Sequence, residues 1–134
     1  MASLNSSRWY WNDGKAVDPF GNDFSGACNY VIFHNKGYGE RSIEYRVYGD
    51  YKMVTGVLAP HAETDQNVTS TVLVYADDKL VYTSPTIGQK TDAFTFSADI
   101  SSAEYIKIEI RFSGHYVFDI FVDQLIVSDV QLWP

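Results

Sequence analysis

Three histidines, together with a few tyrosine, arginine and carboxylate side chains, are the residues of this chain that could bind a small molecule. The histidines are His34, His61 and His115, which are too far apart in sequence to form a local metal-binding motif. A sugar site needs an aromatic face for the apolar side of the pyranose ring and planar hydrogen-bonding groups for its hydroxyls. The candidate ligand-binding residues that meet this requirement are His34, Tyr38, Arg41, His61, His115 and Tyr116.

Two kinds of metal site are alternatives to a sugar site. A transition metal could be held by two or three of the histidines together with Glu63 or Asp119. A structural calcium ion could be held in the loop that begins at Asp18, where Asp18, Asn22 and Asp23 offer oxygen ligands. Aspartate and asparagine are also common in turns for backbone reasons, so the sequence leaves the calcium site open.

Local motifs of common catalytic sites are absent from the sequence. It contains no Gly-x-Ser-x-Gly, no His-Glu-x-x-His and no glycine loop that cradles phosphates. Glu63 and Asp119 could still come together through folding as a glycosidase pair. A compact domain of this size leaves little room for a deep cleft, so we predict that the protein is not an enzyme.

Charge and composition restrict the partners of the chain. The formal net charge is −7, with only 10 lysines and arginines. Phosphate binding needs a positive surface, so nucleic acid and anionic membranes are poor candidates. No apolar run approaches the roughly 20 residues that span a bilayer, and the first residues lack the pattern of a signal peptide. The single cysteine, Cys28, excludes an internal disulfide and is expected to be buried.

The elements that must position the candidate residues are predicted to be short β-strands. In the stretch of residues 42–60, the first arm puts Ile43 and Tyr45 on one face, with the period of two that a half-buried strand needs. Gly49-Asp50 supplies a turn before the apolar second arm. The stretch therefore predicts a β-hairpin.

The remainder of the chain repeats this pattern of strands and turns. Residues 68–84 predict a second hairpin around Asp77-Asp78, and residues 105–112 alternate apolar residues with charged ones, such as Glu109, that should face water. No window has a convincing 3.6-residue period, so no helix is expected. Roughly eight or nine strands predict an all-β fold, an antiparallel β-sandwich of the jelly-roll type.

Chain length predicts a single domain. We expect residues 1–134 to form one β-sandwich, with residues 1–7 as a linker or an added leader.

Strand parity predicts which connections share an end of the sandwich. Successive strands reverse direction, so alternate connections lie together. One end, called the turn end below, should carry Gly49-Asp50, Asp77-Asp78 and residues 99–104, which are mostly glycine, aspartate and serine. The opposite end should gather the loops that hold or adjoin the histidines, and it is where we expect the ligand. These loops, called the binding rim below, are residues 35–40, 61–67, 85–91 and 113–119.

The order of motifs resembles the NPCBM family of carbohydrate-binding modules. The resemblance covers about residues 18–132, and it rests on Asp18 with Gly21-Asn22, then SIEYRVYGDYKMVTGVLAP, TVLVYADDKLVYTSPTI, FTFSADISSAEYIKIEI and VSDVQLW. It implies a β-sandwich that serves as an accessory module of a secreted or surface bacterial protein, linked to other domains, with some relatives binding galactose-type glycans. Galactose-binding relatives carry a Gly-Thr-His-Ala-like element where this chain has only Pro60-His61-Ala62, so their contacts are not transferred.

A carbohydrate ligand at the binding rim is therefore the function that we predict. The alternatives are a protein-interaction or structural module without a sugar ligand, and a metal-binding module that uses the histidines.

Overall fold

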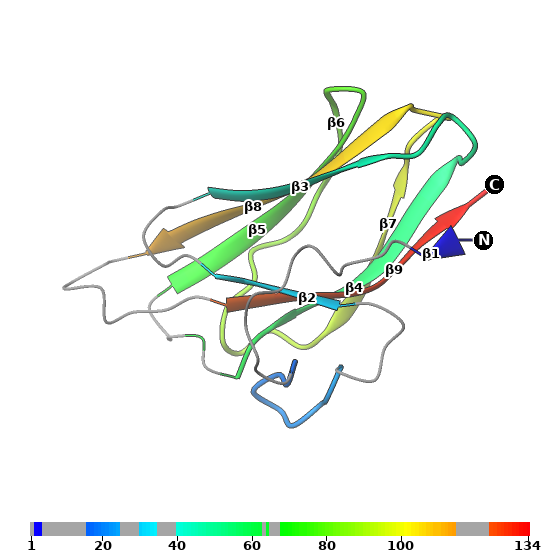
Figure 1. Cartoon of the computed structure of the whole chain (residues 1–134). Coiled ribbons are helices and arrows are strands. Elements are labelled where there is room, and N and C mark those ends of the chain that lie inside the picture. Colours follow the sequence, from blue (N-terminus) through cyan, green and yellow to red (C-terminus); the bar gives the residue numbers. More distant parts are fainter. Residues whose placement is uncertain are drawn as a thin grey trace.

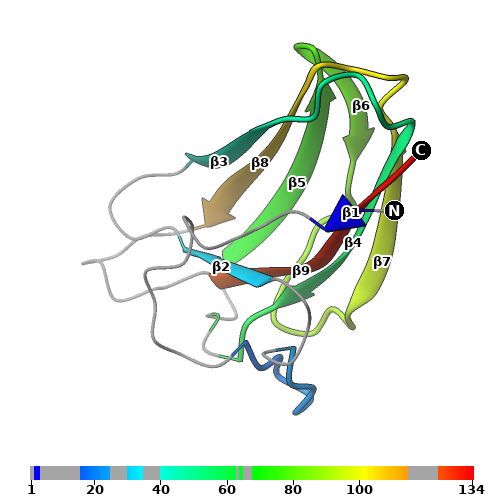
Figure 2. The ribbon, with the colours of Figure 1, turned by 45° about the vertical axis from the view of Figure 1, so that its right-hand side comes forward.

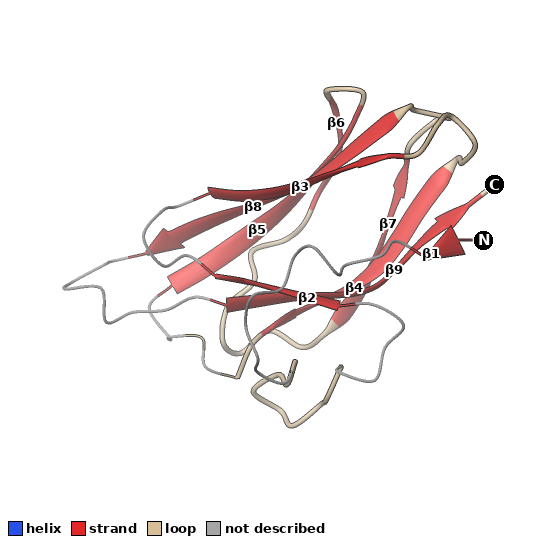
Figure 3. Ribbon diagram, in the orientation of Figure 1, coloured by secondary structure: helices blue, strands red, loops and turns tan. Residues whose placement is uncertain are grey.

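The computed structural model describes residues 2–3, 16–24, 30–34, 40–62, 64, 68–114 and 124–134; side chains are described in these ranges except at residues 2–3, 30–34, 40–41, 114 and 124. This part of the chain contains nine β-strands and no helix (Figure 3). Within these ranges no helix is therefore long and apolar enough to cross a membrane.

The strands form two antiparallel sheets that pack face to face (Figure 1). The first sheet consists of β1 (Ala2–Ser3), β2 (Tyr30–His34), β4 (Met53–Pro60), β7 (Phe94–Asp99) and β9 (Gln124–Trp133). The second sheet consists of β3 (Glu40–Arg46), β5 (Val68–Ala76), β6 (Lys79–Thr83) and β8 (Tyr105–Gly114). Pairing of β1 with β9 places Ala2–Ser3 in a sheet, where the sequence predicted a linker.

The strand order confirms the predicted jelly roll. It is β2-β9-β4-β7 in the first sheet and β3-β8-β5-β6 in the second, with β1 on the same edge of β9 as β2. From β2 to β9 the chain changes sheet at every connection except that between β5 and β6. Among the connections between the described strands, only this one, around Asp77-Asp78, forms a hairpin, as predicted.

The predicted hairpin of residues 42–60 is wrong. Its first arm, β3, pairs with β8, and its second arm, β4, pairs with β7 and β9 in the other sheet. The connection of residues 47–52 crosses between the sheets instead of closing a two-residue turn. Alternation identified the buried face of the first arm correctly, but it contains no information about which strand lies beside it.

Buried side chains between the two sheets follow the predicted alternation. The three isoleucines of β8 are fully buried, and so are Val54 and Leu58 of β4. Glu109, which was expected to face water, lies on the outer face of β8 but is only 9% exposed. Its carboxylate lies 2.9 Å from Arg111 Nε and 3.9 Å from Lys107 Nζ, so two cations accompany the carboxylate that is removed from water.

The three connections of the turn end lie together, as strand parity predicted (Figure 2), and hydrogen bonds join them. The Val47 N–H donates to the Glu104 carbonyl at 2.7 Å. The Asp77 carboxylate accepts hydrogen bonds from the backbone N–H groups of Glu104 (3.1 Å) and Tyr105 (3.0 Å). Asp77 and Asp78 both have positive φ, 47° and 68°, which is typical of a type I′ hairpin turn. The three turns therefore fix one another.

Candidate functional site

The described strand ends and residues of the binding rim lie at the end of the sandwich opposite the turn end (Figure 1). In the first sheet its loops leave from His34 and enter at Gln124, which are paired residues of β2 and β9. In the second sheet they leave from Gly114 and enter at Val68, which are paired residues of β8 and β5. The structure thus brings together the strand ends that carry the predicted rim loops.

The candidate ligand residues are distributed unevenly over the described part. His34 is the last residue of β2 and Arg41 the second residue of β3, and both are described in backbone only. His61 directly follows β4 and is described in full. Tyr38, His115 and Tyr116 lie outside the described residues, as do Glu63, Asp119 and Cys28.

His61 lies beneath the surface of the binding rim, because only 5% of its surface is exposed. The loop that it opens is attached on two sides: the Ala62 N–H donates to the Val17 carbonyl at 2.7 Å, and the Thr64 carbonyl accepts a hydrogen bond from Gln89 Nε2 at 3.1 Å. His61 is therefore placed to support the rim from below.

The loop of residues 85–91 is held by hydrogen bonds within itself and to β5. Ser70 and Ile87 exchange two backbone hydrogen bonds of 2.8 Å, which attach the loop to β5. The Gly88 N–H donates to Thr91 Oγ1 at 2.9 Å, which closes the turn. This loop can serve as a fixed wall for a ligand, since its shape does not depend on the ligand being present.

The loop that begins at Asp18 has the arrangement of an ordinary aspartate turn. Asp18 is 1% exposed, and its Oδ1 accepts hydrogen bonds from the backbone N–H groups of Phe20 (3.0 Å) and Asn22 (2.8 Å). Its Oδ2 accepts a 2.8 Å bond from Asn22 Nδ2. Both carboxylate oxygens therefore stabilise the turn, and Asn22 presents its amide nitrogen to Asp18, which does not fit a calcium ligand set.

Metal binding finds no further support in the described ranges. They contain no cluster of three or more histidine, cysteine, aspartate or glutamate side chains that could hold an ion.

The turn end carries exposed aromatic residues that the sequence prediction overlooked. Tyr48 is 66% exposed, and the Arg46 guanidinium carbon lies 4.7 Å from the centre of its ring and 5.8 Å from that of Tyr105. Arg46 also pairs with Glu104 at 2.7 Å, and this hydrogen bond raises the pKa of the guanidinium. The sequence prediction counted this end as mostly glycine, aspartate and serine, although alternation puts Tyr48 on the outer face together with Arg46.

A family comparison agrees with the motifs in the sequence. The model of the NPCBM/NEW2 domain matches residues 34–123, well over half of the chain. No curated protein matches the sequence.

Solved structures share the fold. The tandem CBM51 modules of Sp3GH98, the family 98 glycoside hydrolase of Streptococcus pneumoniae SP3-BS71, give a TM-score of 0.67 at 19% identity over 91% of this chain and 36% of that chain. The CBM51-2 and INT domains of Clostridium perfringens ZmpB give 0.65 at 14% identity over 98% and 27%. CBM51 of C. perfringens GH95, solved with methyl-galactose, gives 0.63 at 14% identity over 88% and 78%. At these identities the likeness shows the fold alone, and this chain spans a minor part of the first two.

Proposed function

The chain belongs to the NPCBM/NEW2 domain family, and from this membership we propose that it is a carbohydrate-binding module without catalytic activity that holds a glycan at its binding rim. The observation that carries the proposal is the family match over residues 34–123 on a jelly-roll sandwich. It is supported by the shared fold with modules that were solved with methyl-galactose and with GlcNAc.

We propose a different contact with the sugar for each kind of rim residue. Tyr38 and Tyr116 offer rings on which a pyranose can stack. Arg41 and His115 supply planar hydrogen-bonding groups for the sugar hydroxyls, and His34 adds a third such group at the end of β2. His61 is buried, so its proposed role is to support the rim residues from below.

The setting that we propose is an accessory domain of a larger secreted or surface bacterial protein. Comparable modules of C. perfringens ZmpB were solved together with an M60 catalytic domain. The module would keep the attached protein near glycans, and single rim sites of this kind bind weakly, so repeated copies add avidity.

A glycan array tests the proposal directly, with multivalent display to raise weak affinities. Wild-type protein should give sugar signals, and Tyr116→Ala and Arg41→Ala should each bind the same sugars at least about tenfold more weakly, the change produced by about 1.4 kcal/mol. Tyr48→Ala, which removes an exposed tyrosine at the turn end, serves as the matched control and should bind as wild type does. The absence of any sugar signal from folded wild-type protein would refute the function.

A further inference from the structure

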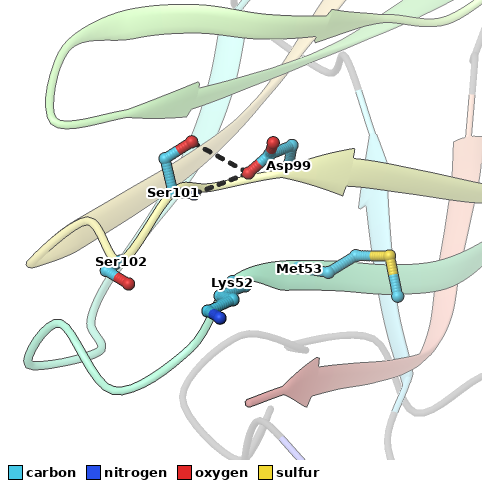
Figure 4. A pocket seen from close by; sticks show the side chains of 5 residues that line it. All are labelled: Lys52, Met53, Asp99, Ser101 and Ser102. Carbon is cyan, nitrogen blue, oxygen red and sulfur yellow. Dashed lines mark hydrogen bonds between the residues drawn. The ribbon is translucent and has the colours of Figure 1, made fainter.

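A concave surface lies on the outer face of the first sheet, away from the binding rim. One depression of about 490 Å³ is lined by Lys52, Met53, Asp99, Ser101 and Ser102 (Figure 4). An adjoining depression of about 310 Å³ lies between β4 and β7 and extends to β9. The two are called the sheet groove below.

The two depressions are lined by different residues, but they follow one another along the same pair of strands, β4 and β7. In the register of β4 and β7, Met53 pairs with Asp99 and Val57 with Thr95, and these side chains line the groove. The four-residue span from Met53 to Val57 is about 13 Å long at the rise of an antiparallel strand. A surface of this length can hold more than one pyranose ring.

A local irregularity of the sheet shapes the groove. The register of β4 on β9 shifts between Thr55 and Val57, and Asp129 has a φ of 50°. Such bulges redirect side chains and occur often next to binding sites. Asp129 lines the groove, and its Oδ1 accepts a 2.9 Å hydrogen bond from Gln131 Nε2, which fixes the carboxylate and an amide beside each other.

An indole ring is fixed at the edge of the sheet groove. Trp133 pairs with Met53 in the sheet, and its Nε1 donates a 2.8 Å hydrogen bond to Thr55 Oγ1, a residue that lines the groove. The Trp133 side chain is held in this way although the residue is 37% exposed. A fixed, exposed aromatic ring beside hydroxyl groups is the combination that sugar recognition requires.

Charges in the sheet groove are few and of both signs. Asp99 Oδ1 accepts hydrogen bonds from the Ser101 N–H (2.8 Å) and hydroxyl (2.9 Å), as Figure 4 shows. Within the described part of the chain, Asp99 Oδ2 and the Lys52 ammonium have no hydrogen bond or ion pair, so both can bind sugar hydroxyls. With two aspartates and one lysine, the groove suits a neutral ligand better than a polyanion.

The groove also has a defined limit. Towards the binding rim the same face of the sheet is covered, because Ala16 packs on Ala59 and Ile126 in a small apolar cluster. The open part of the face is therefore the part with hydroxyl, amide and carboxylate groups.

We propose that the sheet groove binds a neutral glycan chain over more than one sugar unit, as a second contact surface distinct from the binding rim. The inference rests on the proposed function for the class of ligand, but it uses other residues. The two surfaces would then bind different parts of a glycan: the rim would bind a single sugar ring, and the groove would bind several linked rings.

Blocking the groove tests this proposal. Ser97 lies exposed on edge strand β7 and lines the groove, so Ser97→Tyr fills the groove with a residue that strands favour. Thr83→Tyr makes the same kind of change at an exposed position on β6, the edge strand of the other sheet, and is the matched control. The probes are the neutral oligosaccharides of a glycan array and their monosaccharide units, and the Trp133 indole NMR signal, assigned with Trp133→Phe, is followed during titration.

The expected result is that Ser97→Tyr weakens oligosaccharide binding at least tenfold, leaves monosaccharide binding unchanged and abolishes the shift of the Trp133 indole signal, whereas Thr83→Tyr changes nothing. If Ser97→Tyr binds as wild type does and the indole signal stays still while Tyr116→Ala loses binding, the groove proposal is overturned and the rim proposal stands. If Ser97→Tyr loses binding while Tyr116→Ala binds as wild type does, the groove proposal is supported and the proposed rim contacts are refuted. Failure of the wild-type protein to bind any array glycan overturns both.

Discussion

Gly56 on β4 has no room for even one added methyl group, and we predict that Gly56→Ala destabilises the domain. A Cβ atom at this position would lie 2.5 Å from Phe96 Cε1, 3.0 Å from Phe96 Cζ and 3.4 Å from the Ser128 carbonyl oxygen. Real side chains do not approach so closely. Phe96 is itself buried in the core and packs against Tyr82 with ring centres 5.5 Å apart, so the ring has little space to withdraw.

The magnitude follows from two opposing effects. Overpacking a well-packed core costs roughly 1–3 kcal/mol. Alanine restricts the unfolded chain more than glycine does, which offsets about 0.4–1 kcal/mol of this cost. We therefore expect the free energy of unfolding to fall by about 1–2 kcal/mol and the melting temperature to fall by roughly 4–8 °C for a domain of this size.

Thermal and urea unfolding of four variants measure the effect. Gly88→Ala is the matched control, because its added Cβ would meet only Thr69 Cγ2 at 3.7 Å, an ordinary van der Waals distance. We expect its melting temperature to be unchanged or slightly higher. In a Gly56→Ala background, Phe96→Leu should cost less than it does alone, because the smaller side chain relieves the clash. A Gly56→Ala protein as stable as wild type, or a strictly additive double variant, would refute this account.

Two further predictions concern pH and calcium. Burial raises the pKa of Tyr45 to about 12. Because the folded state favours the neutral phenol, the contribution of Tyr45 to the free energy of unfolding is fully present below about pH 10 and is lost as the pH rises towards 12. The loss should be about 1 kcal/mol, since the side chain is only half-buried, and pH-dependent urea unfolding should show no such loss in Tyr45→Phe. Asp18→Ala should lower the melting temperature through the lost turn hydrogen bonds, by the same amount with calcium or with chelator; a wild-type melting temperature that calcium raises would contradict the turn assignment.

The sequence predicted which face of a strand is buried and which connections share an end of the sandwich, but it did not predict which strands pair. The difference has a physical reason. Alternation in residues 105–112 reports which side chains avoid water, and the structure buries the same apolar residues. Strand parity needs only the number of reversals, so it placed the turn end correctly even though the strands on either side of Gly49-Asp50 do not pair. Which strands pair depends on contacts between distant segments, such as β3 with β8, and no local pattern encodes those.

Individual site residues were harder to predict than the fold. His61 is a polar residue in a predicted loop and was expected to be available to a ligand, but its loop is attached to both Val17 and Gln89 and the side chain is buried. Trp133 was considered only as the last residue of the motif VSDVQLW, and its hydrogen bond to Thr55 joins residues 78 positions apart in the sequence. A rule based on residue type therefore selects candidate residues without showing which surface they form.

The division of the sandwich into two ends explains how such a module can change its ligand without losing its fold. At the turn end, Asp77 joins two turns through hydrogen bonds to Glu104 and Tyr105, so a substitution there affects several backbone groups at once. At the binding rim, the described links between loops are single hydrogen bonds, such as that from Gln89 to the Thr64 carbonyl. Among the described residues, a substitution of Gln89 should therefore affect fewer backbone groups than a substitution of Asp77, and we expect it to cost less stability.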